Sequence, residues 1–160
     1  MADNLANLVS KSLRTLLHET MFRAEDSAYL LNPGDLGFVD TLKGLSAEQV
    51  STQPRPGGKP IVSHANHVLY GWELVAKALD GDPSGFATAD WSIAWKLERV
   101  DDAEWRALLE RLEKAARRIL DFGPNFQSWD EVMFTGMYGS AAHTAYHLGA
   151  IRQMLLDVKA

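Results

Sequence analysis

Apolar side chains recur at intervals of three and four residues along most of this chain, a pattern that restricts it to an architecture of amphipathic helices. Near the N-terminus the pattern is carried by Leu13, Leu16, Leu17 and Met21. No alternation of apolar and polar residues is long enough to indicate a strand. The sequence therefore predicts an all-α fold, in the form of a four-helix bundle.

The first helical region is predicted to consist of two pieces. Its apolar periodicity extends over residues 5–45 but weakens near Arg23. The Asn-Pro-Gly-Asp stretch at residues 32–35 places a capping residue before a proline, which predicts a second helix start there. A turn or two of helix should follow at Ser46, because Ser46 and Gln49 have the spacing of a capping box.

Three further long helices are expected, at residues 60–79, at residues 101–122 and from residue 128 almost to the C-terminus. Asp101 and Glu104 have capping-box spacing at the start of the third helix. A glycine and a proline at residues 123 and 124 should end that helix.

The connection between the second and third helices, residues 81–100, is long and is predicted to contain a short helix. It carries Trp91 and Trp95, which we interpret as anchors of the core or of a dimer interface. The predicted architecture is thus a four-helix bundle with a long crossover between helices 2 and 3, in a single domain of residues 1–160.

Charge and cysteine content narrow the possible functions. The chain of 160 residues has a formal net charge of -5, which argues against binding to a nucleic acid. It contains no cysteine, so disulfides and thiolate metal sites are excluded and a cytoplasmic location is expected. The N-terminus lacks the apolar core of a signal peptide, and no stretch approaches the roughly 18 apolar residues of a membrane span.

Two histidines, His143 and His147, lie four residues apart in the run AAHTAYHLGAIRQM. On a helix they project from one face, which continues through Ile151 and should point into the bundle. Burying unpaired imidazoles is unfavourable, because each ring has a donor and an acceptor to satisfy. A shared metal removes that penalty, since the neutral imidazole nitrogen is a good ligand.

A third ligand must come from another helix, and the second helix offers His64 and His67. His67 shares a face with the buried stripe of that helix, and His64 lies one turn earlier on nearly the same face. Three histidines would form a neutral site with a coordination position open to water or substrate. The alternative is that these are core histidines that bind nothing. His18 is expected to be a surface or packing residue.

The two helices that carry the histidines together contain a set of residues that is typical of one protein family. These residues are Ile61 and His67 on the second helix and His143, His147, Gly149, Ile151 and Arg152 on the last helix. This set resembles the DinB/YfiT-like superfamily of small metal-binding four-helix bundles. The resemblance extends from about Gly34 to the C-terminus and leaves residues 1–33 as an N-terminal helical extension. Arg152 lies off the metal-binding stripe and is predicted to form a salt bridge across the bundle.

The resemblance implies that His67, His143 and His147 bind one divalent metal. It selects His67 over His64, because His67 follows the helix-start residue Pro60 by seven positions. Zinc or nickel is favoured as the metal, with iron, manganese and cobalt also compatible. Members of the superfamily include transferases and isomerases that use bacillithiol or mycothiol, and metal-dependent hydrolases.

Small residues on the last helix predict a substrate cavity. Gly136 and Ser140 precede His143 on its own face and would leave space above the metal, although close helix packing would explain them equally well. Tyr146 offers a phenolic hydroxyl to a bound ligand. His64 is a candidate catalytic acid or base, a hydrogen-bond partner of a metal ligand, or a surface residue.

The predicted function is that of a metal-dependent enzyme, a thiol-dependent transferase or a hydrolase, which activates a thiol or water for attack on a small electrophilic substrate. The alternative is a non-catalytic metal-binding module for stress response or ligand binding. The expected partners are a small-molecule substrate, a low-molecular-weight thiol and a second copy of the chain in a homodimer. Neither a nucleic acid nor a membrane is expected.

Overall fold

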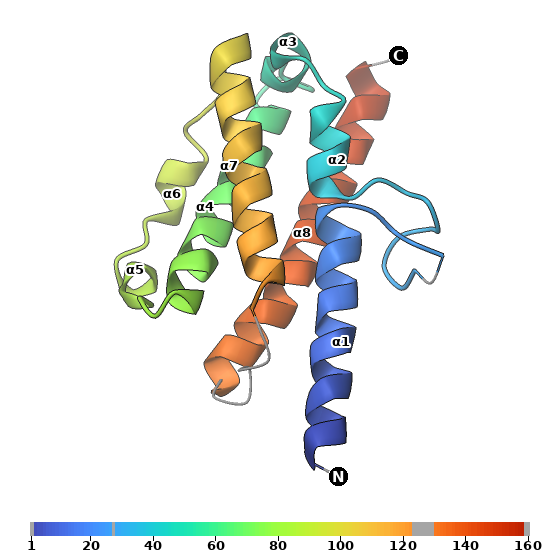
Figure 1. Cartoon of the computed structure of the whole chain (residues 1–160). Helices are drawn as coiled ribbons and strands as arrows, with labels where there is room; N and C mark the ends of the chain where they lie inside the picture. The colour runs from blue at the N-terminus through green and yellow to red at the C-terminus, as the bar shows by residue number, and fades with distance from the viewer. Residues whose placement is uncertain (1, 27, 123–129, 159–160) are drawn as a thin grey trace.

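The computed structural model describes residues 2–26, 28–122 and 130–158, and in these residues the chain is all-α (Figure 1). The only β-type pairing within them is an isolated bridge between Arg23 and Leu36. The prediction of an all-α fold is confirmed. The helices are α1 (Ala2–Met21), α2 (Phe38–Lys43), α3 (Ala47–Ser51), α4 (Ile61–Leu79), α5 (Ser84–Ala87), α6 (Trp91–Ala94), α7 (Asp102–Leu120) and α8 (Glu131–Val158).

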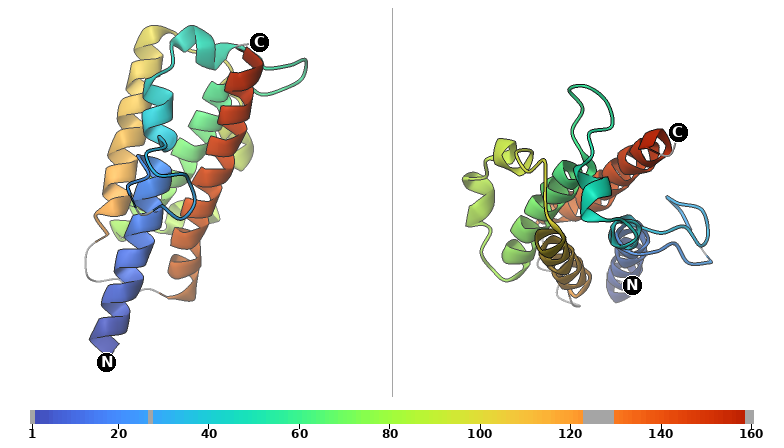
Figure 2. Two further views of the ribbon diagram at one scale, coloured as in Figure 1. Left: turned by 90° about the vertical axis from the view of Figure 1, so that its right-hand side faces the viewer. Right: turned by 90° about the horizontal axis from the view of Figure 1, so that it is seen from above.

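The four longest of these helices lie side by side around a common core (Figure 2). Helix α4 packs against both α7 and α8, and α1 packs against the same two helices. The segment that carries α5 and α6 lies on the outer side of α4, away from α1 (Figures 1 and 2). No helix in the described part of the chain is long and apolar enough to cross a membrane.

Capping boxes set the starts of α3 and α7 where the sequence predicted them. The Asp101 carboxylate accepts hydrogen bonds from the backbone N–H groups of Ala103 and Glu104 at 2.8 Å, and the Glu104 side chain accepts one from the backbone N–H of Asp101. Ser46 and Gln49 form the same reciprocal box at the start of α3. The predicted end at residues 123 and 124 and the predicted start at residue 128 lie outside the described residues.

The predicted helix start at residues 32–35 is wrong, because α2 begins only at Phe38, after Gly37. The intervening loop instead folds back along the end of α1, where the backbone N–H of Gly37 donates to the Phe22 carbonyl at 2.6 Å. A Cβ at Gly37 would lie 2.7 Å from the backbone nitrogen of Phe22, so only glycine permits this approach. A tertiary contact thus overrides the local capping signal.

Two charged side chains fix this loop. The buried carboxylate of Glu19 accepts hydrogen bonds from the backbone N–H groups of the loop, at 2.6 Å from Leu30 and 2.5 Å from Leu31. Arg152 of α8 forms an ion pair with Asp35 at 3.2 Å, which confirms the salt bridge predicted for Arg152. The loop is therefore attached to both α1 and α8.

Trp72 connects α4 to α8 inside the core. Its ring is buried and packs edge-on against Phe38, with ring centroids 5.7 Å apart. Its indole N–H donates to the hydroxyl of Thr144 at 3.3 Å. Because Thr144 follows His143 directly, this hydrogen bond joins α4 to α8 next to the histidines of α8.

Candidate metal centre

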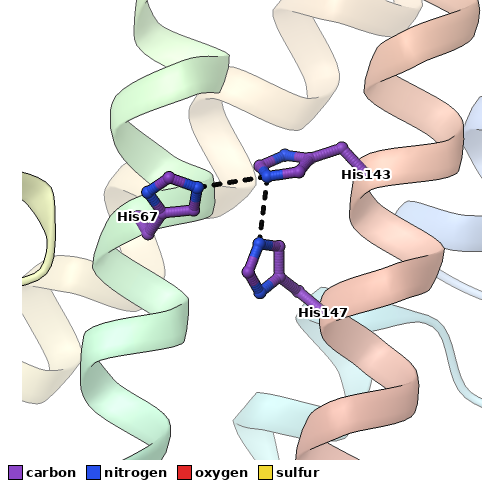
Figure 3. Close-up of side chains that lie close together, drawn as sticks. All are labelled: His67, His143 and His147. Carbon is purple, nitrogen blue, oxygen red and sulfur yellow. Dashed lines mark hydrogen bonds between the residues drawn. The ribbon is translucent and has the colours of Figure 1, made fainter. Parts of the chain in front are cut away.

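Four histidines from two packed helices meet in one cluster. Helix α4 supplies His64 and His67, and α8 supplies His143 and His147. A spacing of four residues places the α8 pair on one face, one turn apart. Figure 3 shows His67 pointing from α4 toward the two rings of α8.

The Nε2 atom of His143 is the centre of the predicted triad. It lies 3.1 Å from Nε2 of His67 and 3.0 Å from Nε2 of His147 (Figure 3). The candidate ligand atoms of the three rings all lie within 4.8 Å of one another. Metal–nitrogen bonds of 2.0–2.1 Å in a tetrahedral site would separate two ligand nitrogens by about 3.3 Å, so the rings stand close to the spacing that a shared ion requires.

The same contacts cannot all be hydrogen bonds. An imidazole nitrogen presents either one hydrogen or one lone pair in the ring plane, so Nε2 of His143 satisfies one of its two close neighbours and not both. Nδ1 of His67 is also buried without a hydrogen-bond partner. A cation that accepts a lone pair from each of the three rings resolves the conflict at His143, and the donor set therefore fits a divalent metal.

The histidines of the cluster are neutral, which is the form in which an imidazole binds a metal. Burial, and then the charges of His143 and His64, lower the pKa of His67 to about 4. Burial, and then the neighbouring histidines, lower the pKa of His147 to about 3. Burial also lowers the pKa of His143 and of His64. At neutral pH all four rings carry a free lone pair.

The metal-free protein should lose stability as the pH falls below about 6.5, because the histidine pKa values lie below 6.5 only in the folded state. Between the unfolded and folded pKa values the unfolded chain binds more protons, so acid favours unfolding. Urea denaturation of metal-free protein near pH 7 and near pH 5 measures this loss. A His67→Leu/His147→Leu double variant should lose less stability between pH 7 and pH 5. An equal loss in both proteins would contradict the assignment of this pH dependence to the histidine cluster.

His64 lies next to the triad but does not share its centre. Its Nδ1 is 3.0 Å from Nδ1 of His147, on the other side of the His147 ring from the atom that faces His143. His64 is partly exposed, whereas His67 and His147 are buried. The structure thus brings His67, His143 and His147 together. His64 lies beside His147, at the ring nitrogen that does not face His143. His18 lies on α1 beside Glu25 at 4.0 Å, outside the cluster.

Two tryptophans that were predicted as anchors of the core or of a dimer interface lie beside the histidine cluster. Trp95 stacks on His67 with ring centroids 4.4 Å apart and packs edge-on against His64 at 5.1 Å. Trp91 is 42% exposed and lies 5.8 Å from the ring of His67. Their spacing of four residues in the crossover was the available signal, but it did not reveal which residues they would contact.

Side chains of α4 hold the crossover in this position. The Asn66 amide donates to the carbonyl of Ala94 at 2.8 Å, and the Ser63 hydroxyl donates to the carbonyl of Leu97 at 2.6 Å. These bonds flank Trp95 on both sides in the sequence. The aromatic wall over the histidines is therefore attached to the helix that carries His64 and His67.

Of the three predicted pocket residues, Gly136 lines a pocket together with side chains of other helices, whereas Ser140 and Tyr146 are not among the residues that line it. Gly136 lines an apolar pocket of about 340 Å³ between α4, α5 and α8, with Val75, Phe86 and Met133. The Ser140 hydroxyl donates to the Gly136 carbonyl at 2.9 Å, within α8. Tyr146 is 70% exposed, and its ring packs edge-on against His147 at 5.0 Å rather than in that pocket.

Comparison with known protein families matches residues 37–151 to a family described as the DinB superfamily. The matched segment begins just before α2 and includes all four histidines of the cluster, but it does not include α1. Neither a curated protein nor a solved structure matches the chain.

Proposed function

The chain belongs to the DinB superfamily, and from this premise we propose that it is a metal-dependent enzyme whose cation is held by His67, His143 and His147. The supporting observation is the convergence of three neutral imidazoles on one point, with His143 Nε2 3.0 to 3.1 Å from the other two. We also propose that α1, α4, α7 and α8 form the four-helix bundle of the superfamily, with α5 and α6 in its crossover.

A divalent metal in this site would lower the pKa of a bound water or thiol and so supply a nucleophile near neutral pH. The residues themselves provide a neutral ligand set that leaves the charge of the cation uncompensated. His143 is partly exposed while His67 and His147 are buried, so a substrate would approach from the His143 side. Nitrogen donors favour zinc or nickel, and iron, manganese and cobalt are also compatible.

The apolar pocket beside Gly136 supports a small organic molecule as substrate. Gly136 precedes His143 by seven residues, which is about 10 Å along a helix. Val75, Phe86 and Met133 give this pocket an apolar lining. We therefore propose that a small electrophile is attacked near the histidines by a low-molecular-weight thiol or by water.

Turnover of a reactive aryl halide with and without a low-molecular-weight thiol should separate the two reactions. We expect zinc- or nickel-loaded protein to conjugate the thiol, and chelator-treated protein to lose that activity. The absorbance of the conjugate measures the rate, and a His18→Ala variant is the matched control that should retain it.

Turnover that does not depend on the thiol would contradict the transferase proposal and favour hydrolysis. Metal binding without turnover in either assay would contradict the enzyme proposal and favour a non-catalytic metal-binding module.

A further inference from the structure

The ring of His147 lies between two other histidines, one at each of its nitrogens. Its Nε2 is 3.0 Å from Nε2 of His143, and its Nδ1 is 3.0 Å from Nδ1 of His64. The two contacts are on opposite sides of the ring, so His64 cannot share an ion with the Nε2 atoms of the triad. Its contact with the site passes through His147.

The position of one proton decides whether His147 can bind a metal. In a hydrogen bond between the two Nδ1 atoms, which lie 3.0 Å apart, one atom donates and the other accepts. If His147 donates, its proton is on Nδ1 and its Nε2 has a free lone pair that faces the triad. If His64 donates, the neutral His147 ring carries its proton on Nε2, and that hydrogen occupies the position of the metal.

We propose that His64 is a positioning residue of the metal centre, which accepts a hydrogen bond from Nδ1–H of His147 and so holds Nε2 of His147 ready to bind the metal. This proposal depends on the proposed metal site, and it assigns a role to a residue outside the triad. Metal-binding histidines generally donate their second N–H to such an acceptor. Here the acceptor is another imidazole, supplied by the helix that also supplies His67.

The surroundings of His64 favour a fixed orientation. Trp95 packs edge-on against its ring, with an interplanar angle of 85°. The backbone on either side of Trp95 is bonded to α4 through Ser63 and Asn66. His64 is therefore held between the crossover and α8 in the position from which Nδ1 meets His147.

Three substitutions distinguish hydrogen-bond acceptance from simple packing. His64→Leu removes the acceptor, and the affinity for Zn²⁺ should fall about 10- to 100-fold. His64→Asn places an amide oxygen close to the position of Nδ1, and the affinity should remain near that of the wild type. His64→Gln places its oxygen one bond farther out, and should not restore the affinity. Competition with a chromophoric chelator measures each value, with His18→Leu as the matched control.

A second readout does not depend on any variant. In zinc-loaded wild-type protein labelled with ¹⁵N, a coupling across the hydrogen bond should join Nδ1 of His147 to Nδ1 of His64, with the proton on His147. A proton on Nε2 of His147 would overturn the proposal, as would unchanged zinc affinity in His64→Leu or equal losses in His64→Leu and His64→Asn. If wild-type protein binds no metal, the proposed function itself fails, whereas these other results would overturn the role of His64 alone.

Discussion

A His143→Ala variant should lose stoichiometric binding of a divalent metal. Nε2 of His143 lies within hydrogen-bond distance of a nitrogen of each of the other two rings, at 3.1 Å from His67 and 3.0 Å from His147. Its loss leaves two ligands on two helices, and the affinity should fall by more than the roughly 100-fold that removal of a supporting hydrogen bond produces. Competition titration of Zn²⁺ against a chelator measures this change.

His18→Ala is the matched control for this experiment, because it removes an imidazole from α1 without touching the cluster. It should retain the metal with wild-type affinity. If His143→Ala binds zinc with unchanged affinity, the metal is bound elsewhere in the protein. That result would contradict the assigned site.

A Trp72→Ala variant should reduce the free energy of unfolding by about 3–5 kcal/mol, the usual range for removal of a large aromatic side chain from a core. Trp72 is 2% exposed, packs against Phe38 and donates a hydrogen bond to Thr144. The substitution removes both the volume and the connection between α4 and α8. Denaturant unfolding of the metal-free protein should show a lower midpoint with an unchanged slope.

Trp91→Ala is the matched control for this loss of stability. It removes the same side chain from the crossover, where the ring is 42% exposed, and it should destabilise the protein far less. Equal losses in the two variants would show that Trp72 does not have the role in the core that its burial indicates.

The helices that carry local start signals were predictable from the sequence. Asp101 with Glu104 and Ser46 with Gln49 form the capping boxes that their spacing predicted. Such signals act through hydrogen bonds within a few residues of the helix start. The start of α2 was not predictable in this way, because it depends on the approach of Gly37 to the end of α1.

The candidate site was predictable only in part, for a similar reason. The spacing of His143 and His147 places them on one face whatever the tertiary fold. The contact between His64 and His147 requires a particular register of α4 against α8, which depends on contacts between the two helices such as the one between Trp72 and Thr144. The stacking of Trp95 on His67 depends on the path of the crossover, which no local pattern indicates.

Anomalous diffraction at the metal absorption edge, from crystals of untagged protein loaded with zinc, tests the central claim most directly. The account predicts one strong peak per chain, bonded to Nε2 of His67, His143 and His147 at about 2.0–2.1 Å. An absence of any peak among these three rings at full zinc loading, or a peak bonded to other residues, would contradict it.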